Sequence, residues 1–345
     1  MANWVSLALF TAFCPSYLIY VVFLFTIYKY RHKQPFTGSF FKLLFCVGIV
    51  DLVMMTENTL LGQFPERGWL GMGSVVLKAP RLLAKAHSLV YWYIAKAQIF
   101  GILFLTINRF VALVLPFYAV WVEENWFKFF VGTLLGALLF NVPLWSQDFH
   151  YVPIDNLNKT AVVQWTNESA YWYYLILCAT LCGLVAVSCS ISYLVIILQT
   201  FNRRSQSNDT RLKSQNRAEL NLLFVGVVLT LCVGECSFAC YMMAIVTDQA
   251  TLEAALPWFS LGTDLLNYVN PYCLLATSAK IRKYFKAVLC CRAANEVIGG
   301  TSQAKTAMTA YRARSGSRNI QTDLNDVVVM DTTPKPRALS ISVHN

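Results

Sequence analysis

The chain has 345 residues, of which 57% are hydrophobic and 13% charged, and its formal net charge is +10. A water-soluble protein of this length cannot hide so much apolar side chain in one or two cores, which excludes an ordinary soluble enzyme or binding protein. We therefore expect a membrane protein, with the bilayer as the solvent for most of its length.

The apolar residues form seven runs that are long enough to cross a bilayer, which takes about 20 residues per helix. The runs cover roughly 6–28, 40–61, 87–115, 125–145, 170–200, 218–247 and 254–278. No basic segment or A-x-A-like cleavage site accompanies the first run, and "YKYRHK" follows it, so we interpret it as an uncleaved signal-anchor. The sequence thus predicts an all-α bundle of seven transmembrane helices.

Basic residues are shared unevenly between the two sides of this bundle. The segments after the first, third and fifth runs, together with the C-terminal tail, hold 22 of the 28 Lys and Arg residues, and the other side has five. The positive-inside rule makes the richer side cytoplasmic, so we expect the N-terminus outside the cell and the C-terminus inside. Because this charge flanks the membrane, it gives no separate basic face for a nucleic acid.

Three N-x-[ST] sequons bear on this topology. Asn158 and Asn167 lie between the fourth and fifth runs, whereas Asn208 lies between the fifth and sixth. Only one of these two segments can be outside, and the charge distribution selects the first. We therefore expect glycosylation at Asn158 and Asn167 but not at Asn208.

Five ionisable residues are expected inside the membrane, where each costs about 2.5–3.5 kcal/mol to insert. They are Asp51, Glu57, Lys96, Glu235 and Asp264. Lys96 is the one cation among them, about 20 Å along its helix from Arg109. Glu235 and Asp264 should reach a similar depth in the outer half of the bundle.

Two compatible accounts of Lys96 stay open. In the first, Lys96 pairs with Asp264 or Glu235 and holds helices together. In the second, a water-filled outer cavity binds a small ligand and is lined by Tyr91, Trp92, Lys96, Glu235, Trp258 and Asp264. A ligand that exchanges partners with such a pair would shift the bundle between two states. A free positive charge would favour a ligand with a carboxylate, a preference that a salt bridge would cancel.

A second buried polar group is expected near the middle of the membrane. Asp51 lies there, Gln98 and Asn267 reach about its level, and Asn270 and Pro271 follow in "NYVNPY". A cluster of this kind could carry a proton or a sodium ion.

Cysteines and histidines are placed in a way that does not favour catalysis. Most of the 11 cysteines fall within the runs, and Cys232, Cys236 and Cys240 share one helix face. We interpret these as small packing residues, in preference to a metal or redox site. The four histidines are scattered over different loops and ends, so no metal-hydrolase cluster can be assembled. We expect no enzyme activity and no cofactor.

The segment "AKIRKYFKAVLCC", residues 279–291, follows the seventh run. Its apolar positions lie on one helix face with basic residues around the rest, which predicts an amphipathic eighth helix on the inner leaflet. Cys290 and Cys291 at its end are candidates for palmitoylation, with reduced cytosolic thiols as the alternative. We divide the chain into a seven-helix transmembrane domain with the eighth helix at 1–290 and a disordered cytoplasmic tail at 291–345, whose hydroxyl residues are candidates for phosphorylation.

Three stretches carry a resemblance to a known family. "PFTGSFFKLLFCVGIVDL" at 35–52, "LFLTINRFVALVLPF" at 103–117 and "NYVNPY" at 267–272 resemble the nematode serpentine chemoreceptors of the Srg superfamily, closest to the Srv class. These are seven-transmembrane G-protein-coupled receptors, and the resemblance covers roughly residues 8–290. It implies a small-molecule ligand, a heterotrimeric G protein, and an arrestin-like protein and a kinase at the tail. It also implies the plasma membrane, with the sensory cilium as the suggested site.

The resemblance assigns G-protein coupling to the inner end of the third helix, at Asn108, Arg109, Phe110 and Pro116. In rhodopsin-type receptors the matching arginine follows an acid, whereas here it follows Asn108. That amide can hydrogen-bond Arg109 but cannot neutralise it, so Glu219 at the inner start of the sixth helix is the candidate anion. Activation would then separate the sixth helix from the third.

Two other functions remain as alternatives. A transporter or ligand-gated channel would use Asp51, Lys96, Glu235 and Asp264 as a conduction path, and would need polar groups at inner depths too. An odorant-gated channel of inverted topology would place the N-terminus and both sequons of the fourth connection in the cytosol. The ligand, the Gα class and the oligomeric state cannot be deduced from the sequence.

Overall fold

The structure is a computed structural model that describes residues 2–33, 35–154, 160–206, 210–245 and 249–290, with the backbone alone for 2–13, 203–206, 210–222 and 249–261. Tail residues 291–345 lie outside this range. The long helices are α1 (Ala2–Lys29), α2 (Ser39–Glu57), α5 (Pro80–Val114), α6 (Pro116–Trp145), α7 (Glu168–Gln206), α8 (Thr210–Ile245) and α9 (Gln249–Thr277). They correspond to the seven apolar runs, so the predicted all-α bundle is confirmed.

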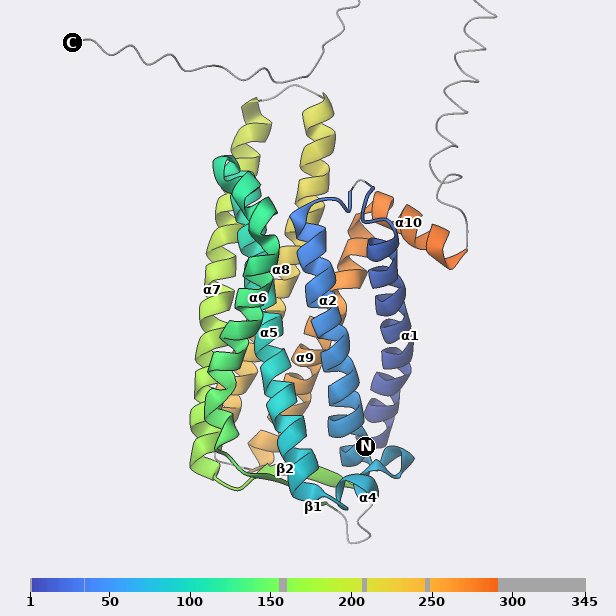
Figure 1. Cartoon of the computed structure of the whole chain (residues 1–345), viewed down its shortest axis with the longest axis vertical. Helices are drawn as coiled ribbons and strands as arrows, with labels where there is room; N and C mark the ends of the chain where they lie inside the picture. The colour runs from blue at the N-terminus through green and yellow to red at the C-terminus, as the bar shows by residue number, and fades with distance from the viewer. Residues whose placement is uncertain (1, 34, 155–159, 207–209, 246–248, 291–345) are drawn as a thin grey trace, which may run out of the picture. The chain divides into compact units, whose positions relative to one another are not determined.

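The long helices lie side by side between two ends, which we name by the elements found there (Figure 1). The hairpin end carries strands β1 (Phe149–Pro153) and β2 (Ala161–Trp165), and the α10 end carries α10 (Ala279–Leu289). Five helical segments of the described chain are long and apolar enough to cross a membrane: Ser39–Arg67, Pro80–Val114, Pro116–Trp145, Glu168–Asn202 and Leu223–Ile245. The chain is a multi-pass membrane protein.

Short helices continue α2 at the hairpin end. The π-helix η1 (Asn58–Gln63) follows α2 without a break and leads into α3 (Phe64–Arg67), the 3-10 helix η2 (Trp69–Gly71) and α4 (Met72–Val76). Gly68 ends α3 in the left-handed conformation, with φ +67°, which glycine adopts at no steric cost. These short elements bring the chain across the hairpin end to the start of α5.

A proline separates α5 from α6. Leu115 is the one non-helical residue between them, with φ −122° and ψ 61°, and Pro116 is the first residue of α6. Proline disfavours a helical conformation in the residue before it but is well suited to the first turn of a helix. The third apolar run therefore ends at the expected place, whereas α6 starts earlier than its apolar run.

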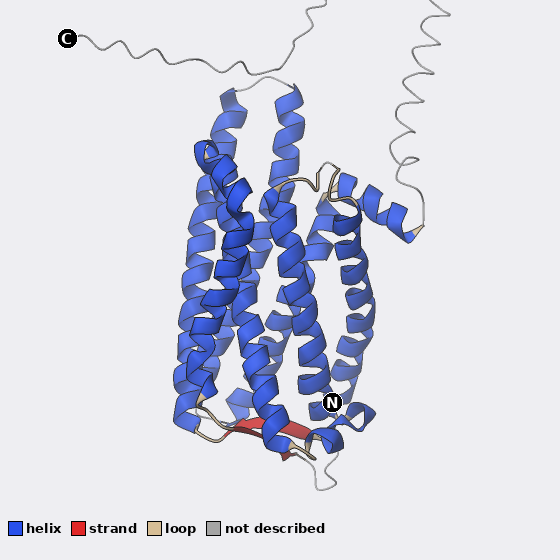
Figure 2. Cartoon of the chain, in the orientation of Figure 1, coloured by secondary structure: helices blue, strands red, loops and turns tan. Residues whose placement is uncertain are grey.

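The β hairpin was not anticipated from the sequence. Its strands are antiparallel, with Phe149 opposite Trp165 and Pro153 opposite Ala161, and they extend across one end of the bundle (Figure 2). Phe149 and Tyr151 point inward and are buried, which is the two-residue alternation expected of a strand with one covered face.

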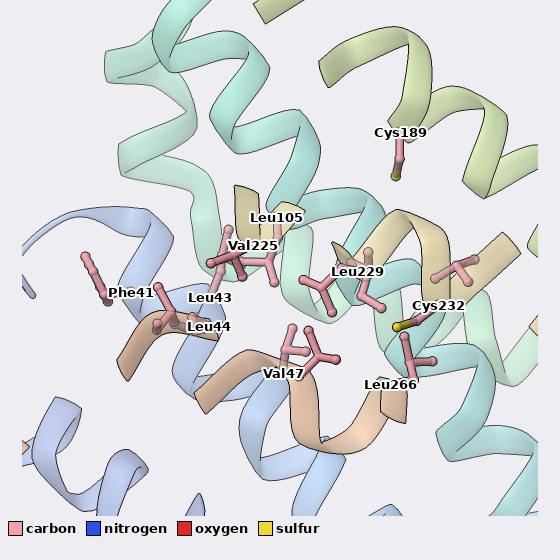
Figure 3. Close-up of a cluster of buried hydrophobic side chains, with 14 of the residues drawn as sticks. Phe41, Leu43, Leu44, Val47, Leu105, Cys189, Val225, Leu229, Cys232 and Leu266 are labelled. Carbon is pink, nitrogen blue, oxygen red and sulfur yellow. The ribbon is translucent and has the colours of Figure 1, made fainter. Parts of the chain in front are cut away.

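The core of the bundle is assembled from short aliphatic side chains of neighbouring helices. Figure 3 shows Leu43, Leu44 and Val47 of α2 meeting Leu105 of α5, Val225 and Leu229 of α8 and Leu266 of α9. All of these side chains are buried. Such a core fixes the helices relative to one another, so polar residues at equal depth on facing helices can meet.

Helix α10 matches the predicted amphipathic helix. Ser278 precedes it, and its Oγ accepts a hydrogen bond from the Ile281 N–H at 3.4 Å, a typical N-cap contact. Ile281 is 1% exposed, and the centroid of the Tyr284 ring lies 4.6 Å from that of Tyr30, the residue that follows α1. Leu289, expected on the apolar face, is exposed.

Candidate functional site

A cavity lies among five helices toward the hairpin end. Its volume is about 40 Å³, and it is lined from α2, α5, α7, α8 and α9. Its polar lining comes from Lys96, Gln98 and Thr263, and the remainder is aromatic, aliphatic or cysteine. Of the residues predicted to line a ligand cavity, Tyr91, Trp92 and Lys96 do so. An apolar hollow with a few converging polar groups is the usual form of a small-molecule site.

Lys96 is held by neutral groups. Its Nζ donates to the Trp92 carbonyl oxygen at 3.0 Å, to Asn141 Oδ1 at 3.1 Å and to the Tyr174 hydroxyl. The ammonium also lies 4.5 Å from the centroid of the Tyr174 ring, within cation–π range. The expected pairing with Asp264 or Glu235 is not formed, because the rotation of α5 directs Lys96 toward α6 and α7.

The acids expected beside Lys96 lie elsewhere. Glu235 packs directly against Gly262 of α9, where any larger residue would overlap its carboxylate. Asp264 does not line the cavity. The side chain of Trp258 lies outside the described residues.

Cysteines form one wall of the cavity. Cys178 and Cys182 come from α7, and Cys236 and Cys240 come from α8. All four are free thiols, and all are buried. They pack as small apolar residues, as the sequence predicted for α8, but they also line the site. Within the part of the chain that the structure describes, no group of three His, Cys, Asp or Glu residues could hold a metal ion.

A buried polar cluster surrounds Asp51. Gln98 Nε2 donates to Asp51 Oδ1 at 2.7 Å and to Asn267 Oδ1 at 2.9 Å, and Asn270 Nδ2 donates to Asp51 Oδ2 at 3.3 Å. The Tyr20 hydroxyl also donates to Asp51 Oδ2, a contact that sequence reasoning missed. Asp51 is fully buried, and Pro271 is buried beside the cluster. Four helices (α1, α2, α5 and α9) are thus joined at one carboxylate.

The hairpin is fastened to the bundle by a group that the sequence did not reveal. His87 Nδ1 of α5 pairs with Glu57 Oε1 of α2, and the His87 and Tyr151 rings stack with centroids 6.4 Å apart. The Tyr151 hydroxyl donates to the Leu61 carbonyl oxygen at 2.5 Å. Leu61 belongs to η1, where the wider turn changes the ordinary helix hydrogen bonding. Burial raises the pKa of the Tyr151 phenol, so it remains a donor at neutral pH.

At the α10 end, Asn108 and Arg109 have separate neighbours. Asn108 is buried, and its Oδ1 accepts from Ser39 Oγ of α2 at 3.0 Å. The Arg109 guanidinium lies over the Phe40 ring, 3.5 Å from its centroid. Phe110 packs against the main core, and Pro116 is exposed at the start of α6. The side chain of Glu219, proposed as the anion for Arg109, lies outside the described residues.

Glu123 is a further residue of this end that the sequence did not single out. Its Oε2 accepts from the Ser39 backbone N–H at 2.8 Å, and its Oε1 lies 3.3 Å from Lys42 Nζ. Glu123 therefore caps the first turn of α2 from α6, where a carboxylate also complements the helix dipole. Ser39 links this contact to Asn108, so α2, α5 and α6 are connected.

The predicted modification sites are partly described. Asn167 is exposed, and its Oδ1 accepts from the Ala170 N–H at 3.2 Å as the N-cap of α7. Cys290 is exposed just after α10. Asn158 and Cys291 lie outside the described residues.

The chain is similar in sequence to known proteins over most of its length. Residues 8–291 match the family described as serpentine type 7TM GPCR chemoreceptor Srv. A curated relative, serpentine receptor class V-1 of Caenorhabditis elegans, is 23% identical over 275 residues, which cover 77% of this chain and 84% of the relative.

Proposed function

The chain belongs to the Srv family of serpentine seven-transmembrane chemoreceptors, and we propose that it binds a small molecule in the hairpin-end cavity and signals to a heterotrimeric G protein at the α10 end. The hairpin end is then extracellular and the α10 end cytoplasmic, in the plasma membrane or its sensory cilium. Asn158 and Asn167 would carry glycans on the outer side.

The observation that carries the proposal is a series of polar contacts along α5. Lys96 and Gln98 line the cavity, and Gln98 also bonds to Asp51. Two turns further, Thr106 Oγ1 donates to the Tyr193 hydroxyl of α7 at 3.1 Å, and Asn108 follows. Cavity and α10 end are about 20 Å apart along this helix. A ligand that moves α5 would therefore bias the contacts at both levels.

The coupling surface in this proposal is built around Asn108, Arg109, Phe110 and Pro116. Ser39 donates a hydrogen bond to Asn108, and Glu219 on α8 is the proposed anion for Arg109. Separation of α8 from α5 would release Arg109 and open a cleft for the G protein. The basic face of α10 would contact lipid headgroups, with a palmitate on Cys290 or Cys291. Residues 291–345 would serve a kinase and an arrestin-like protein.

The test is G-protein dissociation, recorded by energy transfer in cells at matched surface levels. Basal dissociation should fall with Arg109→Ala and rise with Glu219→Ala. Lys128→Ala removes an exposed basic residue of α6 and should change nothing.

Two results would count against the proposal. If the native chain couples but neither variant changes the signal, Arg109 and Glu219 do not form the inner contact. If no Gα class responds while the chain carries current or substrate flux, it is a channel or transporter.

A further inference from the structure

Lys96 is a buried cation that makes three hydrogen bonds, but it forms no ion pair with any acid among the described residues. The side chain is 2% exposed, and its three contacts are all neutral acceptors, which suits the three donors of an ammonium group. Among the described residues, the Lys and Arg ion pairs are Lys42–Glu123 and Lys85–Asp148, and His87 hydrogen-bonds Glu57. None of these includes Lys96, and an unpaired charge in a low-dielectric site is unfavourable.

The described acids of the surrounding helices are directed elsewhere. Asp51 receives donors from Tyr20, Gln98 and Asn270, and Glu57 is paired with His87. Glu235 packs against Gly262, and neither Glu235 nor Asp264 lines the cavity. Lys96 is therefore the charged member of a cavity lining that is otherwise mostly apolar, with its Nζ at the wall toward Asn141 and Tyr174.

We propose that the ligand of this cavity is a small organic acid with an apolar body, whose carboxylate pairs with Lys96. The inference rests on the proposed function, since it names the ligand class of the same cavity. The apolar body would contact Met54, Ile99, Leu181 and Leu266, which line the site. A bound carboxylate supplies the counter-charge that the protein does not, and charge-assisted hydrogen bonds of this type are strong.

The neighbours of Lys96 are arranged to receive an anion. The Tyr174 hydroxyl accepts from Lys96 and donates to Asn141 Oδ1 at 3.3 Å, so a small turn of this O–H lets it donate to a carboxylate in place of Asn141. Asn141 Nδ2 donates to the Leu89 carbonyl oxygen at 2.9 Å, which fixes the amide and its oxygen. A carboxylate that replaces Asn141 at Lys96 would break the side-chain contact between α5 and α6. Binding of the carboxylate and movement of α5 relative to α6 would then occur together.

The experiment uses the purified full chain in lipid nanodiscs and follows thermal unfolding by tryptophan fluorescence at neutral pH. The probes are butanoate, hexanoate, octanoate and phenylacetate, each compared with its primary amide. Lys96→Met removes the charge and keeps the length of the side chain. Lys85→Met is the matched control, because Lys85 is a surface lysine of the same helix paired with Asp148.

At least one acid should raise the unfolding midpoint of the native chain and of Lys85→Met, with an apparent affinity tenfold or more above that of its amide. Lys96→Met should remove this difference. If Lys96→Met does not fold, the acid-to-amide comparison on the native chain still decides. Equal binding of acid and amide, full acid binding by Lys96→Met, or no binding by any acid overturns the proposal. The assay contains no G protein, so Lys96-dependent acid binding without coupling in cells would refute the receptor function alone.

Discussion

Replacing Asp51 by alanine should weaken the bundle more than any other single change in its polar interior. The carboxylate is fully buried and accepts hydrogen bonds from Tyr20, Gln98 and Asn270, which belong to three other helices. Hydrogen bonds between transmembrane helices contribute roughly 0.6–1 kcal/mol each. The loss of all three predicts a decrease of about 2–3 kcal/mol in the free energy of unfolding, by the same per-bond values.

Asp51→Asn should be much milder. The amide keeps the shape and one acceptor oxygen, and the Gln98 and Asn267 amides can turn over to match its NH₂ group. It also removes a negative charge that has no cation beside it in the described cluster. We expect a loss below about 1 kcal/mol, or a gain, because neutralising a buried charge lowers its desolvation cost.

The assay is unfolding in mixed micelles by SDS titration, followed by tryptophan fluorescence. Thr133→Val is the control, because Thr133 is also buried but bonds only to the Phe129 carbonyl oxygen of its own helix, at 3.1 Å. A similar loss for Asp51→Ala and Thr133→Val would refute the idea that Asp51 joins four helices. A large loss for Asp51→Asn would refute the argument from amide reorientation.

Three further predictions concern other parts of the bundle. Gly226→Ala on α8 would make a Cβ overlap the Tyr193 ring and should lower the free energy of unfolding by about 1–3 kcal/mol. In Gly234→Ala on the same helix the new Cβ meets no atom within 4 Å, so this variant should be neutral or stabilising. Equal thermal stabilities of the two variants would contradict this prediction. Tyr151→Phe removes the bond to η1 and should speed hydrogen exchange in both strands without unfolding the bundle, an outcome that unchanged exchange would exclude. Because burial raises the pKa of Tyr151, the contribution of this contact to stability should be complete below the ordinary pKa of about 10 and be lost as pH rises from there through the raised pKa. Asn167→Gln should remove one glycan, which would appear as an increase in gel mobility. The same change removes the N-cap of α7 and should lower the free energy of unfolding by about 0.5–2 kcal/mol. Unchanged mobility would place this loop inside the cell or leave the sequon unused.

The bundle and its polar centre could be predicted because both depend on depth along a helix. Apolar runs show where each helix crosses, and counting residues at a fixed rise puts Asp51, Gln98 and Asn267 at one level. The hydrogen bonds between them follow that expectation. Tyr20 was missed because a tyrosine within an apolar run is uninformative until its neighbour is known.

Partners that depend on rotation about the helix axis could not be predicted in the same way. Depth alone suggested Asp264 or Glu235 for Lys96, but the facing side chains are Asn141 and Tyr174, which carry no charge to attract notice. The Glu57–His87 pair could not be predicted either. Both residues lie near helix ends beside a π-helix, and no residue pattern predicts that π-helix. Glu123 was overlooked because α6 extends beyond its apolar run.

The central claim is that ligand binding in the hairpin-end cavity and G-protein binding at the α10 end are energetically coupled. If they are, the G protein must change the affinity for the ligand by the same factor as the ligand changes the affinity for the G protein. The measurement is the affinity of the tightest-binding carboxylate of the series above for the chain in nanodiscs, with and without a nucleotide-free heterotrimeric G protein. The account predicts that the G protein raises this affinity by roughly 5–150-fold, the usual range of allosteric coupling, and that GTP removes the gain. An affinity that is the same in all three conditions, for every Gα class tested, would contradict it.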